Sequence, residues 1–407
     1  MKVSCTLKPM QHFLVFGNHP RLSLAEFKAI RQDIEKPMII GSAAIVQDAN
    51  WNGDILMQRL GGTVKLGDIV GTLAVDTCDA DAIFALVDSR LRRPSADFGW
   101  TVFGGSKGFA YTLSRMAIPF KKVLKTNGIS SRWVTAEHGG EISPAAVAKL
   151  KLTSDGVDIC LFPEAGLVHV GLTTHVQDAD SWSLRDYGRP ARDDKNGMLP
   201  PKLARMMVNI ANIPRNGTLV DPFCGSGTVC MEATLCTHAS HIIGSDIVAK
   251  QIADSIRNQE WLVKNGIYRE DDISRLKLFV SDVKKIGSHI ANSSVDAVVT
   301  EGYLGPTLRG NEDVEILRKN VTLVKELWHE TLKALHPALK KDGIVVCIWP
   351  GYKTTKGSAF VSLELDLENL GYVLVEPVGD WEKNHGPLVY SRPDQHITRR
   401  IVVLKKI

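Results

Sequence analysis

The second half of this 407-residue chain alternates short, continuously apolar segments with longer amphipathic ones, and this rhythm constrains the fold more than any other feature. The segments at 241–244 (HIIG) and 297–300 (AVVT) are apolar, as expected of parallel strands that helices cover on both faces. The segment at 247–265 has the spacing of an amphipathic helix. Such repeated β/α units predict an α/β fold with one doubly wound, Rossmann-like sheet, whose ligands bind at the carboxyl ends of its strands.

The first half has a different pattern, in which short apolar runs dominate. Apolar segments at 12–17 and 38–46 flank a helical segment at 24–32, and further short strands follow. This half is therefore expected to be α+β, with small sheets. Between Val176 and Pro201 the sequence is rich in Asp, Arg, Gly and Pro and has little apolar periodicity, which predicts a linker between the halves.

Composition sets the class of protein. With 44% hydrophobic and 23% charged residues and a net charge of +4, the chain has the composition of a globular protein with two or three domains of roughly 100–200 residues each. No segment approaches the roughly 18 apolar residues of a membrane span, and the start is not typical of a signal peptide, so a cytoplasmic protein is expected. Seven cysteines without a CxxC pair argue against a disulfide framework and against a metal site.

The charge is unevenly distributed along the chain. Between Gly104 and Lys151, eight basic residues are accompanied by only two acidic ones. Such a segment is either a solvated helix face or a nucleic-acid-binding surface, and the sequence leaves both open. The residues that we expect to contact RNA in the second case are Lys121, Lys122, Lys125 and Arg132.

The most informative segment is a glycine-containing turn at 218–230 (TLVDPFCGSGTVC), where an apolar strand ends in Asp221 and leads into a helix. A dinucleotide-binding turn requires a third glycine where this chain has Cys230. The cofactor S-adenosylmethionine fits better, because its ammonium group can be held by an acid that would repel a pyrophosphate. Within the turn, the residues expected to contact this cofactor are Asp221, Phe223, Gly225 and Gly227.

Two further acids follow predicted strands. Asp246 lies 25 residues after Asp221, close to the roughly 20-residue offset of a ribose-binding acid in related folds, and we expect it to accept hydrogen bonds from the ribose hydroxyls. Asp282 ends the next strand, where the adenine amine would lie. Either acid alone could equally be a helix cap.

Three long segments carry a resemblance to a known family. The segments at 221–233 (DPFCGSGTVCMEA), 185–211 and 391–404 (SRPDQHITRRIVVL) resemble the THUMP-containing tRNA guanosine N2-methyltransferases of archaea and eukaryotes, which modify position ten of tRNA. The opening segment at 12–30 is similar to their ferredoxin-like domain, so the resemblance covers nearly the whole chain.

The resemblance implies a domain order and two groups of site residues. Residues 1–60 would form the ferredoxin-like domain, 61–175 a THUMP-like RNA-binding domain, 176–200 a linker and 201–407 the Rossmann-like methyltransferase domain. Residues before the first helix of that domain pass over the methionine end of the cofactor in the family; here they are Met198, Leu199 and Pro200. Arg185 and Arg189 are candidates for tRNA phosphate contacts or for closing the active site, and a surface salt bridge would explain each of them equally well.

The catalytic motif differs from that of the family. The family has an acid, two prolines and an aromatic residue, whereas this chain has Glu301, Gly302, Tyr303 and Leu304. The N2 lone pair of guanine is delocalised into the ring, so a carboxylate that accepts a hydrogen bond from the amine helps it to attack a methyl group. The resemblance therefore implies that Glu301 is the catalytic acid and that Tyr303 stacks on a flipped base. A structural turn after a strand would explain the same residues without a catalytic role.

Three functions are compatible with these patterns. The favoured one is a tRNA guanine-N2 methyltransferase with tRNA as substrate and, as a further partner, a small activating subunit. The second is a DNA amino-methyltransferase, and the third is a tRNA-binding protein that has lost the reaction. Neither a membrane nor a metal ion is expected as a partner.

Overall fold

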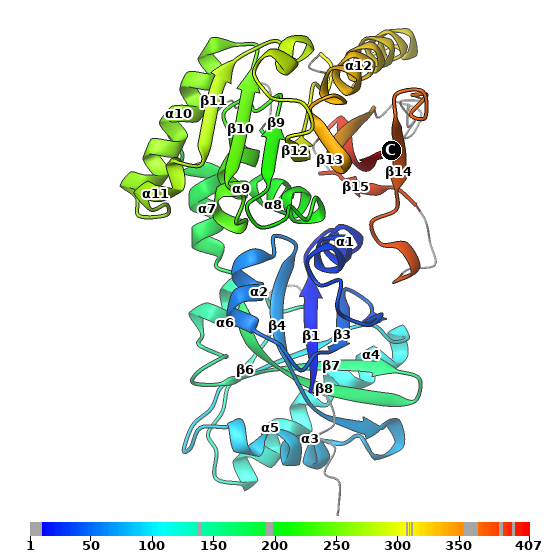
Figure 1. Ribbon diagram of the computed structural model, residues 1–407. Helices are drawn as coiled ribbons and strands as arrows, with labels where there is room; N and C mark the ends of the chain where they lie inside the picture. Colours follow the sequence, from blue (N-terminus) through cyan, green and yellow to red (C-terminus); the bar gives the residue numbers. More distant parts are fainter. Residues whose placement is uncertain are drawn as a thin grey trace, which may run out of the picture. The chain divides into compact units, whose positions relative to one another are not determined.

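The computed structural model describes residues 10–136, 140–192, 198–306, 308, 310, 312–352, 365–381, 386–392 and 395–407. The chain divides into two compact units (Figure 1). The first comprises Met1–Pro20 and Asp33–Asp180, and the second comprises Arg21–Gln32 and Ser181–Ile407.

The first unit contains one eight-stranded sheet with the strand order β2-β3-β1-β4-β8-β7-β5-β6. The expectation of small sheets is wrong. The 12-residue strand β4 pairs with β1 on one side and with β8 on the other, and it thereby joins strands β1 to β3 and strands β5 to β8 into one sheet. The strands are β1 (Gln11–Phe16), β2 (Met38–Ile40), β3 (Ala43–Gln47), β4 (Thr63–Ala74), β5 (Phe98–Val102), β6 (Trp133–Val134), β7 (Val157–Glu164) and β8 (Leu167–Val176).

Short helices accompany this sheet. Phe98, Trp100 and Phe120 pack edge-on and tilted against one another in the core between β5 and α5. The helices are α2 (Gly53–Arg59), α3 (Ala80–Val87), α4 (Lys107–Arg115), α5 (Ala117–Thr126) and α6 (Pro144–Lys149), with 3-10 turns η1 (Val75–Thr77) and η2 (Asp88–Arg90).

The second unit contains the expected β/α sheet, with the strand order β11-β10-β9-β12-β13-β16-β14 and with β15 paired to β16. Strands β9 to β13 are mutually parallel, and β16 runs antiparallel to β13. The strand order reverses between β9 and β12, which is where ligands bind in such sheets. The strands are β9 (Thr218–Asp221), β10 (His241–Asp246), β11 (Leu276–Val280), β12 (Val295–Thr300), β13 (Leu339–Tyr352), β14 (Tyr372–Val375), β15 (Leu388–Tyr390) and β16 (Ile397–Lys406).

Helices of the second unit supply its apolar core. Trp328 and Leu332 of α12 pack with Val298 of β12 and Val345 of β13, and Met231 of α9 packs with residues of α10. The helices are α1 (Pro20–Ile30), α7 (Ala179–Tyr187), α8 (Pro201–Ile210), α9 (Thr228–Cys236), α10 (Ala249–Lys264), α11 (Glu270–Ile273) and α12 (Val314–Leu335), with 3-10 turns η3 (Val283–Ser288) and η4 (Gly379–Trp381).

Two helices differ from the expectations. Residues 179–187, which lie in the segment interpreted as a linker, form helix α7 and bury Trp182. Helix α1 comes from the start of the chain but packs in the second unit, where the Asn209 amide donates a hydrogen bond of 2.7 Å to the buried Glu26 carboxylate. Lys28 of the same helix donates to the Val378 carbonyl at 2.7 Å. Contacts of this kind join residues too distant in sequence for a periodic pattern to predict them.

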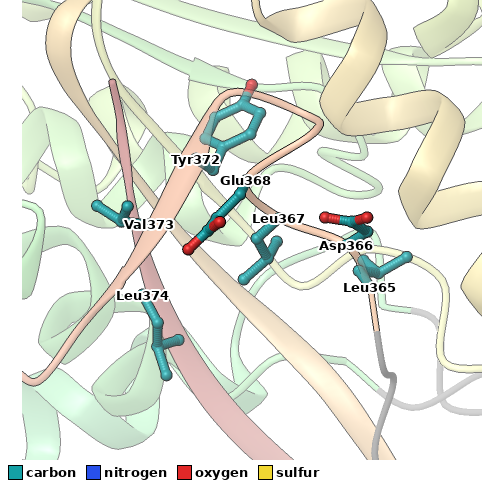
Figure 2. A pocket seen from close by; sticks show the side chains of 7 residues that line it. All are labelled: Leu365, Asp366, Leu367, Glu368, Tyr372, Val373 and Leu374. Carbon is teal, nitrogen blue, oxygen red and sulfur yellow. The ribbon is translucent and has the colours of Figure 1, made fainter.

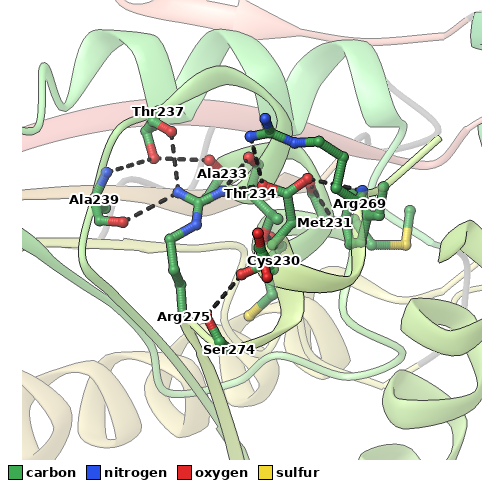
Figure 3. A network of polar contacts seen from close by, with 12 residues as sticks. Cys230, Met231, Ala233, Thr234, Thr237, Ala239, Arg269, Ser274 and Arg275 are labelled. Carbon is green, nitrogen blue, oxygen red and sulfur yellow. Dashed lines mark hydrogen bonds and ion pairs between the residues drawn. The ribbon is translucent and has the colours of Figure 1, made fainter.

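Helix α9, which follows the glycine turn, is fixed at its other end by Arg275 (Figure 3). The guanidinium donates to the Thr234 carbonyl at 2.8 Å and to the Thr237 and Ala239 carbonyls at 3.1 Å each. A cation at a helix C-terminus satisfies the last carbonyls and is favoured by the helix dipole. Arg275 therefore helps to hold the helix that begins at the glycine turn.

Candidate active site

Four carboxylates lie at the carboxyl edge of the second sheet, each at the end of one of four adjacent strands or one to two residues beyond it. Asp221 is the last residue of β9 and pairs with Gly244 of β10, while Asp246 is the last residue of β10 and pairs with Val280 of β11. Neighbouring strands are about 4.8 Å apart. The strand order therefore places the acids in a row along the edge, in the sequence Asp282, Asp246, Asp221 and Glu301.

Asp221 is the most deeply buried acid of this row. Burial raises its pKa to about 7, and the nearby charges of Asp246 and Glu301 add to the shift. Two polar groups oppose this rise in pKa: the Thr300 side chain and, to a smaller extent, the Phe223 backbone N–H, which donates to Asp221 Oδ1 at 3.2 Å. A buried carboxylate with two acidic neighbours binds a cation favourably, because the cation removes both the repulsion and part of the cost of desolvation.

The glycine turn requires both of its glycines, for different reasons. Gly225 has φ +51°, and a Cβ there would meet no atom within 4 Å, so the backbone faces open space that a ligand can approach. Gly227 has φ +88°, and a Cβ there would collide with the Ser255 hydroxyl of α10. One glycine therefore leaves room for a ligand, and the other lets helix α10 pack against the turn.

Asp246 closes the turn through backbone contacts. Its Oδ2 accepts a hydrogen bond from Gly225 N–H at 3.1 Å, and its Oδ1 accepts one from Val248 N–H at 2.9 Å. Each carboxylate oxygen has a second lone pair, so Asp246 can still accept hydrogen bonds from the two hydroxyls of a ribose. Asp282 caps turn η3, since its Oδ1 accepts a hydrogen bond from Lys284 N–H at 3.0 Å. The capping role that the sequence left open is thus present in Asp282, whereas helix α10 begins after Val248 and has no side-chain cap.

The segment before helix α8 lies next to the turn. The Ser226 hydroxyl donates to the Met198 sulfur at 3.7 Å, and both Leu199 and Pro200 are buried where α8 begins. Asn258 of α10 adds a link that the sequence did not reveal. Its side-chain amide donates to the Ala191 carbonyl at 3.0 Å and to the Ser226 carbonyl at 2.9 Å.

The loop after β12 carries Glu301 and Tyr303. Glu301 Oε1 accepts a hydrogen bond of 2.6 Å from Arg399 Nε, a contact that the sequence did not predict. Gly302 has φ +70°, a value that proline cannot adopt, and a Cβ there would come within 2.5 Å of the Trp328 ring. The departure from an acid-proline motif therefore accompanies a different backbone. Tyr303 is 39% exposed, so its ring is accessible to a ligand.

Comparisons with known proteins agree with this geometry. A family model described as "RMKL-like, methyltransferase domain" matches residues 189–362. These residues match a methyltransferase domain and make up less than half of the chain. The methyl donor is S-adenosylmethionine, as the glycine turn predicted.

One of the curated relatives matches a larger part of the chain than the family model does. This chain is 25% identical over 255 residues to the tRNA (guanine(10)-N2)-dimethyltransferase of Methanocaldococcus jannaschii, and the match covers 61% of this chain and 63% of the relative. The protein of the same name from Methanothermobacter thermautotrophicus is 25% identical over 174 residues, which are 43% of this chain and 41% of the relative. Both matches span less than two thirds of the relatives' own length.

The fold resembles that of a solved structure over nearly its whole length. The crystal structure of TrmN from Thermus thermophilus matches with a TM-score of 0.55 and 15% identity, covering 98% of this chain and 100% of that one. This likeness concerns the fold, and it confirms the α/β class with a Rossmann-like methyltransferase domain.

Three residues of the methyltransferase domain have properties that suit the cofactor. The buried Asp221 suits an ammonium group, the open backbone at Gly225 suits close approach of the ligand, and Asp246 retains acceptor capacity for a diol. Among the residues that the structure describes, no group of three or more metal-ligating side chains is present. No helix in the described ranges is long and apolar enough to cross a membrane.

Arg185 and Arg189 do not lie at the surface, and we correct the expectation that they contact RNA. Arg185 is 5% exposed, and its Nε donates to Glu232 Oε1 at 2.8 Å. Arg205 binds the other oxygen of Glu232 at 2.8 Å, so the three side chains form a buried ion-pair triad. Arg189 is 2% exposed and donates to the Thr228 hydroxyl at 2.7 Å. Both arginines therefore bind helix α9 of the domain.

The basic residues of the first unit that we expect to contact RNA do lie at the surface. Lys121, Lys122 and Lys125 are exposed on α5, and within the described part of the chain none of the three forms an ion pair. Arg132 differs, because its Nη2 donates to Asp97 Oδ2 at 2.7 Å and its charge is thereby compensated. The lysines of α5 thus remain available to an anionic partner.

A hollow of about 400 Å³ lies beside β14, the strand at one side of the second sheet (Figure 2). Strands β13 and β16 separate β14 from β12. The hollow contains none of the residues expected to bind cofactor or substrate. Its lining includes Asp366, Glu368 and Tyr372. The carboxyl edge of β9 and β12 is therefore the better candidate for the active site.

Proposed function

We propose that this chain is a cytoplasmic tRNA (guanine-N2)-methyltransferase that methylates the exocyclic N2 amine of a guanosine, at position 10. The main support is Glu301, a partly buried carboxylate next to the cofactor edge, where the sheet order reverses. The names of the relatives, tRNA (guanine(10)-N2)-dimethyltransferases, favour this amine among the possible substrates.

Each cofactor residue has a proposed part. Asp221 holds the ammonium group, Asp246 the ribose diol and Asp282 the adenine amine. The turn shapes the pocket for the ligand through Phe223, Gly225 and Gly227. The methionine end is covered by Met198, Leu199 and Pro200.

The bound cofactor supplies an electrophilic methyl group on a sulfonium. Glu301 accepts a hydrogen bond from the N2 amine, which localises the nitrogen lone pair and directs it at the methyl carbon. As the new N–C bond forms, the bond between the methyl carbon and the sulfonium sulfur breaks, and its electron pair stays on the sulfur, which leaves as a neutral thioether. The methylated nitrogen then carries one proton too many, and Glu301 takes it up. Tyr303, whose ring is accessible, stacks on the guanine and holds it outside its helix.

The first half would bind the tRNA. We propose residues 1–60 as a ferredoxin-like domain and 61–175 as a THUMP-like domain, whose strands share one sheet. Residues 176–200 would be the linker, which includes helix α7, and 201–407 the methyltransferase domain. The exposed lysines of α5 support RNA binding by this half, because shape and phosphate contacts dominate the recognition of folded RNA.

The test is mass spectrometry of nucleosides after incubation of the full chain with labelled S-adenosylmethionine and, in parallel reactions, with unmodified tRNA or with DNA. N2-methylguanosine is expected, and sequencing of the tRNA should place it at position 10. The matched variant Glu301→Gln keeps the shape of the side chain and should lower kcat by about 10²-fold or more, the size of a lost general base. If DNA is methylated and the tRNA stays unmethylated, the enzyme is a DNA amino-methyltransferase instead.

The same assay distinguishes an active enzyme from a binding protein and tests the need for a partner. Tight tRNA binding without methylation would favour a tRNA-binding protein that has lost the reaction. Full activity of the chain alone would show that no activating subunit is needed, and the ratio of monomethylated to dimethylated guanosine would give the number of methyl groups added.

A further inference from the structure

Arg399 comes from a strand that is not adjacent to β12, yet its side chain reaches Glu301. It lies on β16, which runs antiparallel to β13, and it pairs with Pro350 of that strand. Cys347 of β13, three residues earlier, pairs with Thr300, the last residue of β12. Because three strand residues span about 10 Å, Arg399 stands above the carboxyl edge, at the height of the loop that begins with Glu301.

The contact between the two side chains is short and shielded from water. Arg399 Nε donates to Glu301 Oε1 at 2.6 Å, and the two side chains are 5% and 17% exposed. Arg399 is itself held, because its Nη1 donates to Gln395 Oε1 at 2.8 Å. Within the described ranges, Glu301 Oε2 accepts no hydrogen bond, so this oxygen remains available for a substrate amine.

The backbone of the loop is fixed by other contacts. Gly302 lies against the Trp328 ring, and the Tyr352 hydroxyl donates to the Leu304 carbonyl at 2.8 Å. Removal of the Arg399 guanidinium would therefore release the Glu301 side chain but leave these two contacts in place. A glutamate has one more rotatable bond than the aspartate of the resembling motif, so it loses more conformational freedom when it is held in one orientation.

We propose that Arg399 is a positioning residue, which holds Glu301 Oε1 so that Oε2 faces the amine to be methylated. This inference rests on the proposed catalytic role of Glu301. It assigns Arg399 no contact with the substrate or the cofactor: its effect is exerted entirely through the carboxylate.

The first experiment compares Arg399→Gln with the wild type in the full chain. We expect kcat to fall by about 10- to 100-fold, the size expected of a small misplacement of a catalytic group, while the Kd of S-adenosylmethionine and the KM for tRNA change less than about 3-fold. Arg399→Lys keeps the charge and should recover part of kcat. The control is Arg400→Gln, the next residue of β16, which points to the other face and should keep kcat within about 3-fold of the wild type.

The second experiment separates positioning from a purely structural role. Arg399→Gln is introduced into the Glu301→Gln chain, where no carboxylate remains to be positioned, and no further loss of kcat is expected. An additional loss of the same size in this background would overturn the proposal, because Arg399 would then act independently of Glu301. Melting temperature and S-adenosylmethionine binding verify that each variant folds, and if Arg399→Gln does not, the pair is repeated with Arg399→Lys.

The outcomes distinguish this inference from the function on which it rests. An Arg399→Gln enzyme with wild-type kcat would overturn the inference and leave the proposed function intact. A wild type that binds tRNA and S-adenosylmethionine but methylates no guanosine would overturn both.

Discussion

The affinity for S-adenosylmethionine should depend on pH through Asp221. Burial raises the pKa of this carboxyl to about 7 in the free domain, whereas the cofactor's ammonium group would bind its ionised form. Binding needs the ionised carboxyl and the protonated amine, so relative to pH 7.5 the affinity should be about 2-fold weaker at pH 6.5 and about 17-fold weaker at pH 5.5. Above pH 8 the affinity should fall again, because the amino group of the cofactor loses its proton near pH 7.7–8.0.

Isothermal titration calorimetry measures both the affinity and the protons released. At pH 6 binding should release about one proton, which appears as a dependence of the binding enthalpy on the buffer. Asp221→Asn should abolish this release and flatten the pH profile. 5′-Methylthioadenosine, which lacks the ammonium group, is the matched ligand, and its affinity for the wild type should change little between pH 7.5 and pH 5.5.

The same carboxyl has the opposite effect on the stability of the free domain. Its folded pKa, about 7, lies above the unfolded value near 3.9, so the ionised form destabilises the folded state and stability falls as pH rises from about 4 to 7. Asp221→Asn should therefore raise the melting temperature of the cofactor-free chain at pH 8 while weakening cofactor binding. Equal pH profiles for the two ligands, or a profile unchanged in the variant, would refute the assignment of Asp221 to the ammonium group.

Three other predictions follow from the site. Asp246→Ala should weaken S-adenosylmethionine binding by about 1.5–3 kcal/mol in calorimetry, since a charged acceptor of hydrogen bonds is lost; unchanged affinity would count against its ribose role. Tyr303→Ala should weaken productive tRNA binding by about 1–3 kcal/mol with cofactor affinity retained, and a kcat/KM equal to the wild type would exclude stacking. Neutral residues in place of Lys121, Lys122 and Lys125 should flatten the slope of log tRNA affinity against log salt concentration by about 2–3 units. Filter binding at several salt concentrations measures this slope, and an unchanged slope would show that the three lysines only face solvent.

Local sequence chemistry determined the strand ends and the glycine turn to which we assign the cofactor. Asp221 ends an apolar strand, Gly225 and Gly227 follow within six residues, and Asp246 ends the next strand. Each of these signals lies within one β/α unit, where periodicity and turn chemistry decide the structure. Parallel pairing then brings such strand ends to one edge, so residues far apart in the sequence could still be placed together from the pattern alone.

The surroundings of the arginines were decided by the tertiary structure. In the sequence, Arg185 and Arg189 lie in a polar segment and suit an RNA surface, but helix α7 buries the first against Glu232 and the second packs against Thr228. Arg399 lies in a terminal strand with nothing beside it to indicate Glu301, which is 98 residues away. Whether an arginine faces water, a structural carboxylate or a catalytic one depends on which strands and helices pack side by side. That is set by the burial of apolar faces over the whole unit, to which the charged side chain itself contributes little.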